Sequence, residues 1–557
     1  MSPPRAGPAS LALALALGGV SALVFVFALS RHIHVDEFHN VFSMQLVGSF
    51  GKSDYADPAE LYHVLFAPLT RRFESTRSIF FALRIVWGAL FIGLFAGLAW
   101  VQPFFPQLWG RALVFVAVAS WWPAWRHGFE VRHDLLLALG VVWLYRVGLE
   151  AERHERLSAW SAALAGAAAA WMQLDSHKAV TLWGPALLYI LALRVHVARP
   201  DARRSAGWLA VGLCCGVLSG FGLLWWGGAL GAYFTQLAHF SHYAAGAERL
   251  SPLPLFVFML ETGSIQIAFV LLFLVGALLQ KMRQRLAPHA LTTLAFLSFS
   301  LLALAVNPVP FPYNMVWATP ALLLAATAGA HWLLQQTPRL RLLLAGALVA
   351  LCMAQFEHQI VSDDYMNRSW DAQLKLVEAV ESLTGPSEPV FDGVGMVCTR
   401  PPATRDWLLH SVFMPEYETG RREQLRDVIA RVAPPVLIGG HYRFDWLLDA
   451  DRSAIAAHYL GLSRQLWVLG VQTVGVEAAV SILRAGRYQV LPLAPSDGSV
   501  QVDGQSVAAR GVVSLTAGTH QVVGAAAIVW LGPALQDVPA GLALGGSLFA
   551  PRRLPGQ

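Results

Sequence analysis

Long apolar runs alternate with short polar segments through the first 356 residues of the chain. A bilayer core about 30 Å thick is crossed by roughly 20 apolar residues in helical form, and about eleven runs reach or approach that length. The sequence therefore predicts a polytopic α-helical membrane protein. The spans are expected at about residues 10–30, 78–101, 110–125, 134–150, 158–173, 179–195, 206–227, 263–280, 289–306, 314–334 and 341–356.

The first of these runs follows Arg5 and could be mistaken for a signal peptide. From Leu11 to Leu29 it is longer than the apolar region of a typical signal, and no small-residue cleavage site follows it. We expect it to be retained as the first span.

Arginine and lysine residues concentrate in alternate loops between the predicted spans. The positive-inside rule places these loops in the cytoplasm. The N-terminus is then cytoplasmic, and an odd number of spans places the C-terminal region outside. The long first outer loop carries Arg71, Arg72 and Arg77 against this trend, whereas the later loops agree with one another. The basic loops lie near residues 111, 153–156, 199–204, 281–285 and 339–341.

Segments on the predicted outer face include two long loops and the whole C-terminal third. Segment 31–77 has apolar residues at helical spacing within 38–46 and 61–69, which predicts amphipathic helices lying along the membrane surface. Segment 227–262 is the second such loop.

The chain changes character after Phe356, where charged residues return at the density of a soluble protein. Helical patterns that alternate with short apolar strands predict an extracytoplasmic α/β domain at 357–474. Short strands separated by glycine turns predict a small β-sandwich domain at 475–557. Residues 1–356 form the predicted transmembrane domain.

Composition supports the bilayer as the main solvent of this chain. Of its 557 residues, 56% are hydrophobic and 13% are charged, about half the charged fraction of soluble domains. The net charge of +5 comes without a basic block interleaved with aromatic residues, so we expect no nucleic-acid partner. The four cysteines lack metal-ligand or redox spacing.

Candidate chemistry begins with Asp36 and Glu37, about six residues beyond the first span. A carboxylate that is partly desolvated at the membrane boundary gains basicity and can take a proton from an acceptor hydroxyl. The competing interpretation is an acidic first turn of a surface helix, which the helix dipole favours. Two adjacent carboxylates could also bind a divalent cation weakly, although no set of metal ligands is predicted.

The next two outer loops carry cations and a further acid. Arg132 can hold a phosphate by a forked contact, and Asp134 can orient that arginine or cap the following helix. Lys178, beside His177, can reach a phosphate as a point charge, or it can snorkel to the interface.

The later outer loops supply histidines and a tyrosine. His239 and His242 have i, i+3 spacing but no matched carboxylate, which favours packing or substrate contact over metal binding. Tyr313 and Asn314 open the tenth predicted span after a proline-rich segment. All these candidates fall on one predicted face, where acids and cations together suit a base and a phosphate leaving group.

The pattern resembles the GT-C superfamily of membrane glycosyltransferases, particularly the protein mannosyltransferases and bacterial aminoarabinose transferases. The resemblance covers roughly residues 10–356. It is carried by Val35-Asp36-Glu37 after the first span, the Arg132-His133-Asp134-Leu135-Leu136 loop, the Lys178 loop, and Tyr313-Asn314 followed by Ala318-Thr319-Pro320-Ala321-Leu322. Lys178 is followed by alanine where glycine is expected, and Asn314 stands where an arginine is frequent.

The resemblance implies a glycosyltransferase of the bacterial-type inner (plasma) membrane. It implies that Asp36 is a catalytic base or substrate anchor with Glu37 beside it, and that Arg132 and Lys178 contact the carrier phosphate. The donor would be a polyprenyl-phosphate-linked sugar, transferred with inversion to a protein, lipid or cell-envelope glycan. The C-terminal part resembles outside domains of such proteins, and we expect it to bind the acceptor or to anchor the protein in the envelope.

Two other functions remain open from the sequence. A transporter or flippase of a lipid-linked saccharide would be expected to have paired halves, broken helices and midplane charges, none of which is evident. A non-enzymatic envelope protein would act through the C-terminal region.

Overall fold

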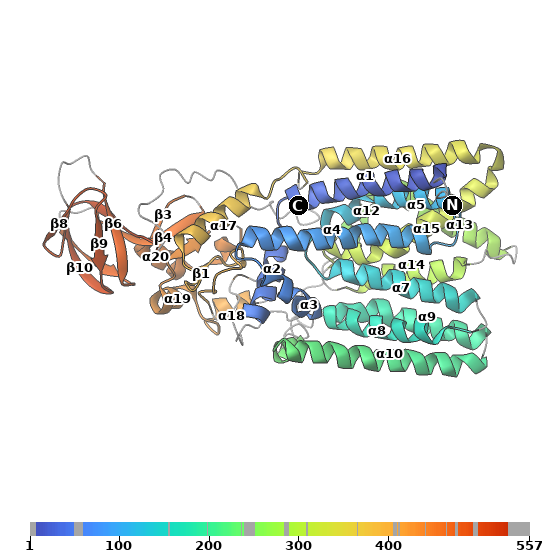
Figure 1. Cartoon of the computed structure of the whole chain (residues 1–557), viewed down its shortest axis with the longest axis horizontal. Coiled ribbons are helices and arrows are strands. Elements are labelled where there is room, and N and C mark those ends of the chain that lie inside the picture. Colours follow the sequence, from blue (N-terminus) through green and yellow to red (C-terminus); the bar gives the residue numbers. More distant parts are fainter. Residues whose placement is uncertain are drawn as a thin grey trace, which may run out of the picture.

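The molecule is elongated, with a bundle of long helices at one end and a strand-rich region at the other (Figure 1). The computed structural model describes residues 7–49, 60–153, 156–197, 199–235, 237–238, 251–282, 289–307, 310–364, 366–404, 409, 413–439, 442–463, 465–473, 477–493 and 500–532. The chain passes from the bundle to the strand-rich region after α16 and through α17 (Asp371–Leu383).

Each predicted span corresponds to a helix of the bundle, apart from one break in the third. The bundle helices are α1 (Pro8–Ser30), α4 (Thr76–Val101), α5 (Leu108–Ala119), α7 (Asp134–Arg153), α8 (Ala159–Asp175), α9 (Val180–Val197), α10 (Arg199–Trp226), α13 (Ser264–Met282), α14 (Ala290–Val306), α15 (Met315–Gln336) and α16 (Arg341–Ser362). α12 (Leu253–Thr262) is a shorter apolar helix of the same bundle.

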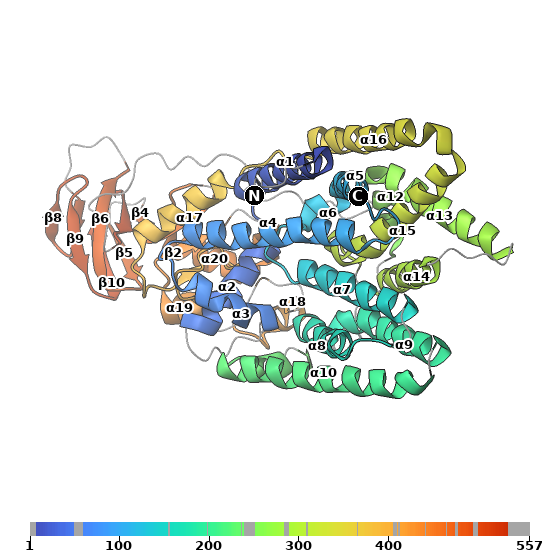
Figure 2. The ribbon, with the colours of Figure 1, turned by 45° about the vertical axis from the view of Figure 1, so that its right-hand side comes forward.

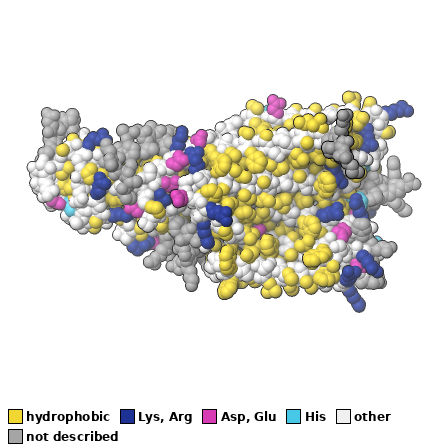
Figure 3. All heavy atoms as spheres, in the orientation of Figure 1, with side chains coloured by type: hydrophobic (Ala, Val, Ile, Leu, Met, Phe, Trp, Pro, Cys, Tyr) yellow, Lys and Arg dark blue, Asp and Glu magenta, His cyan; other side chains and the backbone are white. Residues whose placement is uncertain are grey.

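The described helices confirm a polytopic membrane protein. Seven of them are long and apolar enough to cross a bilayer, namely α1, α4, α10, α13, α16, and α9 and α15 with the short 3₁₀ turns that precede them. Their outward residues form a broad apolar band in Figure 3, and Trp100, Leu188 and Leu218 are among the exposed side chains of the bundle. Lysine and arginine gather at the end of the band away from the strand-rich region (Figure 3).

The expected span at 110–125 is instead two helices. α5 ends at Ala119 after 12 residues, which is about 18 Å and too short to cross a bilayer alone. α6 (Trp122–His127) then begins with Pro123 in its first turn. Proline has no N–H to donate to a preceding turn and its ring crowds that turn, which disfavours an uninterrupted helix here.

The predicted surface helices are present, with α2 almost wholly buried and α3 buried in part. α2 (Val35–Ser49) and α3 (Leu61–Thr70) lie where the bundle meets the C-terminal region (Figures 1 and 2). Phe38, Val41 and Met44 of α2 are fully buried, whereas Leu65 of α3 is 36% exposed. The apolar face of α2 is therefore covered by protein, where the sequence alone predicted contact with lipid.

The C-terminal region combines a mixed sheet with a second, antiparallel sheet. The larger sheet has the order β1-β2-β4-β11-β6-β9, with β3 beside β4, and the smaller one has the order β5-β10-β7-β8. β1 and β2 are parallel, and all other pairs are antiparallel. The strands are β1 (Val390–Phe391), β2 (Val436–Ile438), β3 (Tyr459–Gly461), β4 (Leu466–Thr473), β5 (Glu477–Ile482), β6 (Gly486–Pro492), β7 (Val500–Val502), β8 (Gln505–Val507), β9 (Val512–Leu515), β10 (Gly518–Val523) and β11 (Ala526–Trp530).

The two halves of this region share β4, a strand that the sequence analysis missed. β4 pairs with β2 on one side and with β11 on the other, so the larger sheet contains strands from both of the predicted C-terminal domains. Both β4 and β11 are almost wholly apolar, which removes the alternation by which half-exposed strands are recognised. The helices of the region are α18 (Met414–Glu418), α19 (Leu425–Val432) and α20 (Asp449–His458), and its 3₁₀ turn is η4 (Tyr442–Trp446).

Close packing of α8 on α10 gives a test of the bundle. A Cβ atom added to Gly212 would lie 1.8 Å from the carbonyl oxygen of Ala163, whereas one added to Gly207 would meet nothing within 4 Å. Small residues allow membrane helices to approach closely. We expect Gly212→Ala to destabilise the protein by about 1–3 kcal/mol through overpacking, measured by thermal unfolding in detergent. Gly207→Ala, on the same helix, should leave the melting temperature unchanged or raise it.

Candidate active site

The chain turns after α1, and Arg84 of α4 holds the turn. Its guanidinium is fully buried and donates to the backbone carbonyls of Ala28 (3.0 Å), Arg31 (2.6 Å) and His32 (3.1 Å). The same group forms a two-pronged ion pair with Glu37, in which both N–O distances are 2.7 Å. Glu37 is therefore fully buried and directed at α4.

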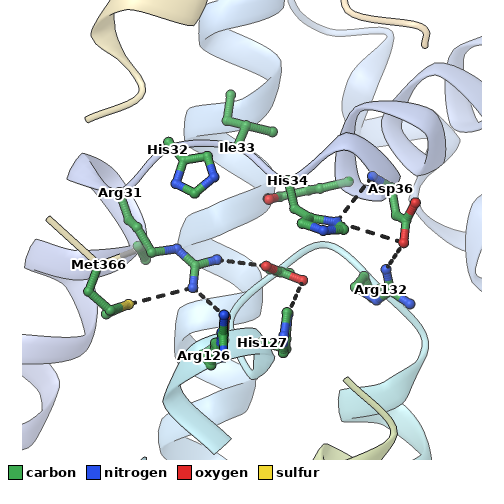
Figure 4. A network of polar contacts seen from close by, with 12 residues as sticks. Arg31, His32, Ile33, His34, Asp36, Arg126, His127, Arg132 and Met366 are labelled. Carbon is green, nitrogen blue, oxygen red and sulfur yellow. Dashed lines mark hydrogen bonds and ion pairs between the residues drawn. The ribbon is translucent and has the colours of Figure 1, made fainter. Parts of the chain in front are cut away.

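A second buried ion pair holds the loop before α7 against this turn. Arg31 binds Glu130 at 2.9 Å, and the other carboxylate oxygen of Glu130 lies 3.0 Å from Nδ1 of His127 (Figure 4). The side-chain amide of Asn40, on α2, donates to the carbonyl of Val131 at 2.9 Å. These contacts set the position of the 126–134 loop against the start of α2.

Asp36 lies one residue before Glu37 and faces Arg132. Its Oδ2 accepts a hydrogen bond from Nη1 of Arg132 at 2.8 Å, and Nδ1 of His34 lies 3.7 Å from the same oxygen (Figure 4). Arg443, from η4 of the C-terminal region, approaches the other oxygen, with Nη2 at 3.6 Å from Oδ1. The Asp36 side chain keeps 30% of its surface exposed, so it remains reachable.

These neighbours determine the ionisation of Asp36. Burial alone would raise the pKa of the Asp36 carboxyl, but the charges of His34, Arg132 and Arg443 outweigh that effect. The pKa of Asp36 is consequently held well below its usual range, and the group is a carboxylate at neutral pH.

Arg132 stands at the centre of the array. Its Nε donates to Oδ2 of Asp134 at 3.0 Å, on the side away from its bond to Asp36. The guanidinium also lies over the ring of Tyr313, 3.7 Å from the centroid, which is a cation–π contact. The structure thus brings Asp36, Arg132, Asp134 and Tyr313 together from three separate segments of the chain.

A second polar group adjoins this array. Nδ1 of His133 lies 3.0 Å from Oε2 of Glu60, the residue before α3. Burial lowers the pKa of His133, but Glu60 and Asp134 overcome that effect and raise it above the ordinary histidine value. Lys178 is close enough to interact electrostatically with Asp134, Arg132 and Glu60, and His177 is a neighbour of Glu60 and His133.

Several polar atoms of this group make no hydrogen bond to any described residue. They are the hydroxyl of Tyr62, Oδ1 of Asp134 and the ammonium of Lys178, of which the first two are buried. A buried polar atom left without a partner costs on the order of 1–3 kcal/mol. All three residues lie close enough to Arg132 to interact with it, so their free polar atoms could be satisfied by a polar ligand bound there.

The remaining predicted site residues are placed differently. Oδ1 of Asn314 accepts hydrogen bonds from Asn307 (3.0 Å) and from the backbone N–H of Phe311 (2.9 Å), so Asn314 holds its own loop. His239 and His242 lie outside the described residues.

No shared cation site exists between Asp36 and Glu37, because Glu37 is paired with Arg84. Across the described part of the chain, no group of three or more histidine, cysteine or acidic residues could hold a metal ion.

Three residues at or beside this array escaped the sequence analysis. Glu60 precedes an apolar helix and carries no motif. His34 lies next to the predicted acids, but a single histidine in a loop gives no signal. Arg443 comes from the C-terminal region, and no local pattern could place it beside Asp36.

The Arg84–Glu37 pair gives the test for this geometry. Glu37→Gln leaves the buried Arg84 charge without its partner, so we expect a loss of about 3–5 kcal/mol in unfolding free energy, measured by denaturation in detergent. Glu378→Gln, which breaks the half-exposed pair with Arg77, serves as the matched control and should cost at most about 1 kcal/mol. Equal effects of the two substitutions would show that Glu37 does not anchor the turn.

Comparison with known proteins supports the fold and little else. No protein-family model and no curated protein matches the chain. The structure of ArnT from Cupriavidus metallidurans aligns with a TM-score of 0.52 at 13% identity, over 82% of this chain and 97% of ArnT. The arabinosyltransferase EmbB from Mycobacterium smegmatis aligns over 96% of this chain and 66% of its own, at 12% identity, but its TM-score of 0.41 is too low to add support. The chain therefore has a fold similar to that of ArnT, one of the proteins that the sequence resemblance pointed to.

Proposed function

We propose that the protein is a glycosyltransferase that moves a sugar from a polyprenyl-phosphate carrier to an acceptor at the end of the bundle adjoining the C-terminal region. The observation that carries the proposal is the Asp36–Arg132–Asp134 array. It places the reachable carboxylate of Asp36 directly beside the nearly buried guanidinium of Arg132. The ammonium of Lys178 lies near Arg132 and Asp134. Transfer from a sugar phosphate needs both a proton acceptor and a site for the departing phosphate.

The chemistry follows from these two requirements. The acceptor oxygen attacks the anomeric carbon of the sugar while the bond from that carbon to the phosphate oxygen breaks. The electron pair stays on the phosphate, where Arg132 and Lys178 stabilise the charge. The acceptor proton passes to the carboxylate of Asp36. Attack from the face opposite the phosphate inverts the anomeric centre.

The low pKa of Asp36 fits this role if the donor rearranges the ion pairs. Without a ligand, Arg132 is shared by Asp36 and Asp134. A phosphate that binds Arg132 competes with Asp36 for the guanidinium, because phosphate accepts the same forked contact. Loss of that contact raises the basicity of Asp36 once the donor is in place.

The other candidates take supporting parts in the proposal. Glu37 positions Asp36 through Arg84 and does not itself meet substrate. The unpartnered atoms of Tyr62 and Asp134 suit the hydroxyl groups of a sugar. His177 lies beside Lys178 and near Glu60 and His133.

The proposal includes a location and an architecture. The membrane is a bacterial-type inner membrane, with the N-terminus in the cytoplasm and the active site outside. The transmembrane catalytic domain spans 1–356, followed by domains at 357–474 and 475–557 that are joined through β4. The acceptor is a protein, lipid or envelope glycan that approaches from the C-terminal region.

Replacement of the proposed base tests the mechanism. Asp36→Asn should lower turnover by about 10²–10⁴-fold, because proton transfer loses its acceptor. The measurement is release of polyprenyl phosphate from a panel of polyprenyl-phosphate sugars by the full chain in lipid nanodiscs, with envelope extract as acceptor.

The control is Asp364→Asn, which changes an exposed carboxylate 74% accessible to solvent and should leave turnover unchanged. If Asp36→Asn turns over as fast as the native chain, Asp36 is not the catalytic base. Movement of the lipid-linked sugar across the bilayer without any transfer product would instead favour the transporter.

Cysteine labelling tests the location. In a chain whose native cysteines are replaced by alanine, Ser382→Cys on the exposed face of α17 should react with a membrane-impermeant maleimide in intact cells. Arg339→Cys, in the basic turn between α15 and α16, should react only after the cells are permeabilised. The reverse pattern would place the proposed active site in the cytoplasm.

A further inference from the structure

Arg443 is the one residue of the C-terminal region that the structure shows in contact with the charged array, among the residues described. It lies in η4, and its side chain is nearly buried, with 7% of its surface exposed. Nη1 donates to the carbonyl oxygen of Leu409 at 3.0 Å, so that edge of the guanidinium is occupied. Nη2 points toward Asp36 at 3.6 Å, a separation too long for a hydrogen bond.

The two oxygens of Asp36 thus face guanidinium groups from different parts of the molecule. Oδ2 is bound by Arg132 of the membrane bundle, and Oδ1 is approached by Arg443 of the C-terminal region. One small carboxylate separates two arginines, and the contact with Arg443 is loose. An anion with more oxygens than a carboxylate would satisfy both arginines better, since each guanidinium has several donors.

The charges around Asp36 point the same way. Among the described residues, the guanidinium groups of Arg132 and Arg443 both face the single carboxylate of Asp36, and Lys178 lies near Asp134. A phosphate has more oxygens than a carboxylate and can accept hydrogen bonds from several of these cations at once.

The position of Arg443 is supported by a firm junction between the two parts. The side-chain amide of Gln373, on α17, accepts from the backbone N–H of Ile33 at 2.6 Å and donates to its carbonyl at 2.8 Å. Arg31 and Ser369 form an isolated β-bridge beside it. The turn that carries Asp36 is therefore held by the C-terminal region as well as by Arg84.

We propose that Arg443 is the second arginine of the anion site, binding the phosphate of the lipid-linked donor together with Arg132. The C-terminal region then supplies part of the catalytic centre, beyond any role in holding the acceptor. This inference rests on the proposed function, because it takes the phosphate of the carrier as the anion. It identifies a ligand-binding residue that the transmembrane part cannot provide.

The experiment measures binding of farnesyl phosphate, a short polyprenyl phosphate, to the full chain in detergent by titration calorimetry. Arg443→Gln should weaken binding by about tenfold to a hundredfold, as expected for loss of a charge-assisted hydrogen bond. Arg443→Lys should keep part of the affinity, because it retains the charge but loses the fork. Farnesol, the uncharged analogue, should bind the variants and the native chain alike.

Arg426→Gln is the matched control, because it removes a half-exposed guanidinium of the same region whose ion pair with its neighbour Asp427 is loose, at 3.9 Å. It should bind farnesyl phosphate as the native chain does. The melting temperature of each variant shows whether it is folded. If Arg443→Gln does not fold, the binding measurement is made on Arg443→Lys instead.

A double substitution separates phosphate binding from a merely structural role. If Arg443 contacts the phosphate, Arg443→Gln weakens binding by the same factor in the Asp36→Asn background. If Arg443 acts only by holding Asp36, its effect disappears in that background, and the inference is overturned. Weaker binding in Arg132→Gln with native binding in Arg443→Gln would also overturn it while the proposed function stands. If both Arg132→Gln and Arg443→Gln bind farnesyl phosphate as the native chain does, neither arginine belongs to a phosphate site, and the proposed function loses its support as well.

Discussion

The ion pair between Arg84 and Glu37 lies where α1, α2 and α4 meet, and the geometry of the site depends on it. A buried guanidinium must satisfy all of its donors, and Arg84 does so with Glu37 and the carbonyls of the turn after α1. Successive residues of a helix point about 100° apart. Fixing Glu37 toward α4 therefore turns Asp36 away from it and toward Arg132.

Two carboxylates that are adjacent in the sequence thus differ, because Glu37 has a structural role and Asp36 is the proposed base. Glu37 is buried and fully paired, whereas Asp36 keeps part of its surface exposed and is held between two arginines. The division explains why the adjacent acids do not form a cation site. It also concentrates the proposed chemistry on one side chain whose partners a phosphate can displace.

The C-terminal region is part of this arrangement rather than an appendage. The side chain of Gln373 forms hydrogen bonds with the backbone of Ile33, and Arg443 approaches Asp36 from the 3₁₀ turn that follows β2. At the same junction, α2 is almost wholly buried and α3 is buried in part. Membrane bundle and C-terminal region therefore shape one site, and charges that would be costly to bury singly are balanced by groups from both.

The sequence by itself determined that this is a membrane protein and where nearly all the bundle helices lie. It also placed Asp36, Arg132 and Lys178 at one end of the bundle. Both follow from hydropathy and from the charge of the loops, which are local properties of the sequence on which insertion into a bilayer depends. Only the tertiary structure decided which acid faces the site. It also revealed the break before Pro123, the shared strand β4 and the approach of Arg443. Those features depend on contacts between distant segments, such as Asp36 and Arg132, 96 positions apart, and no periodicity along the chain encodes such a meeting.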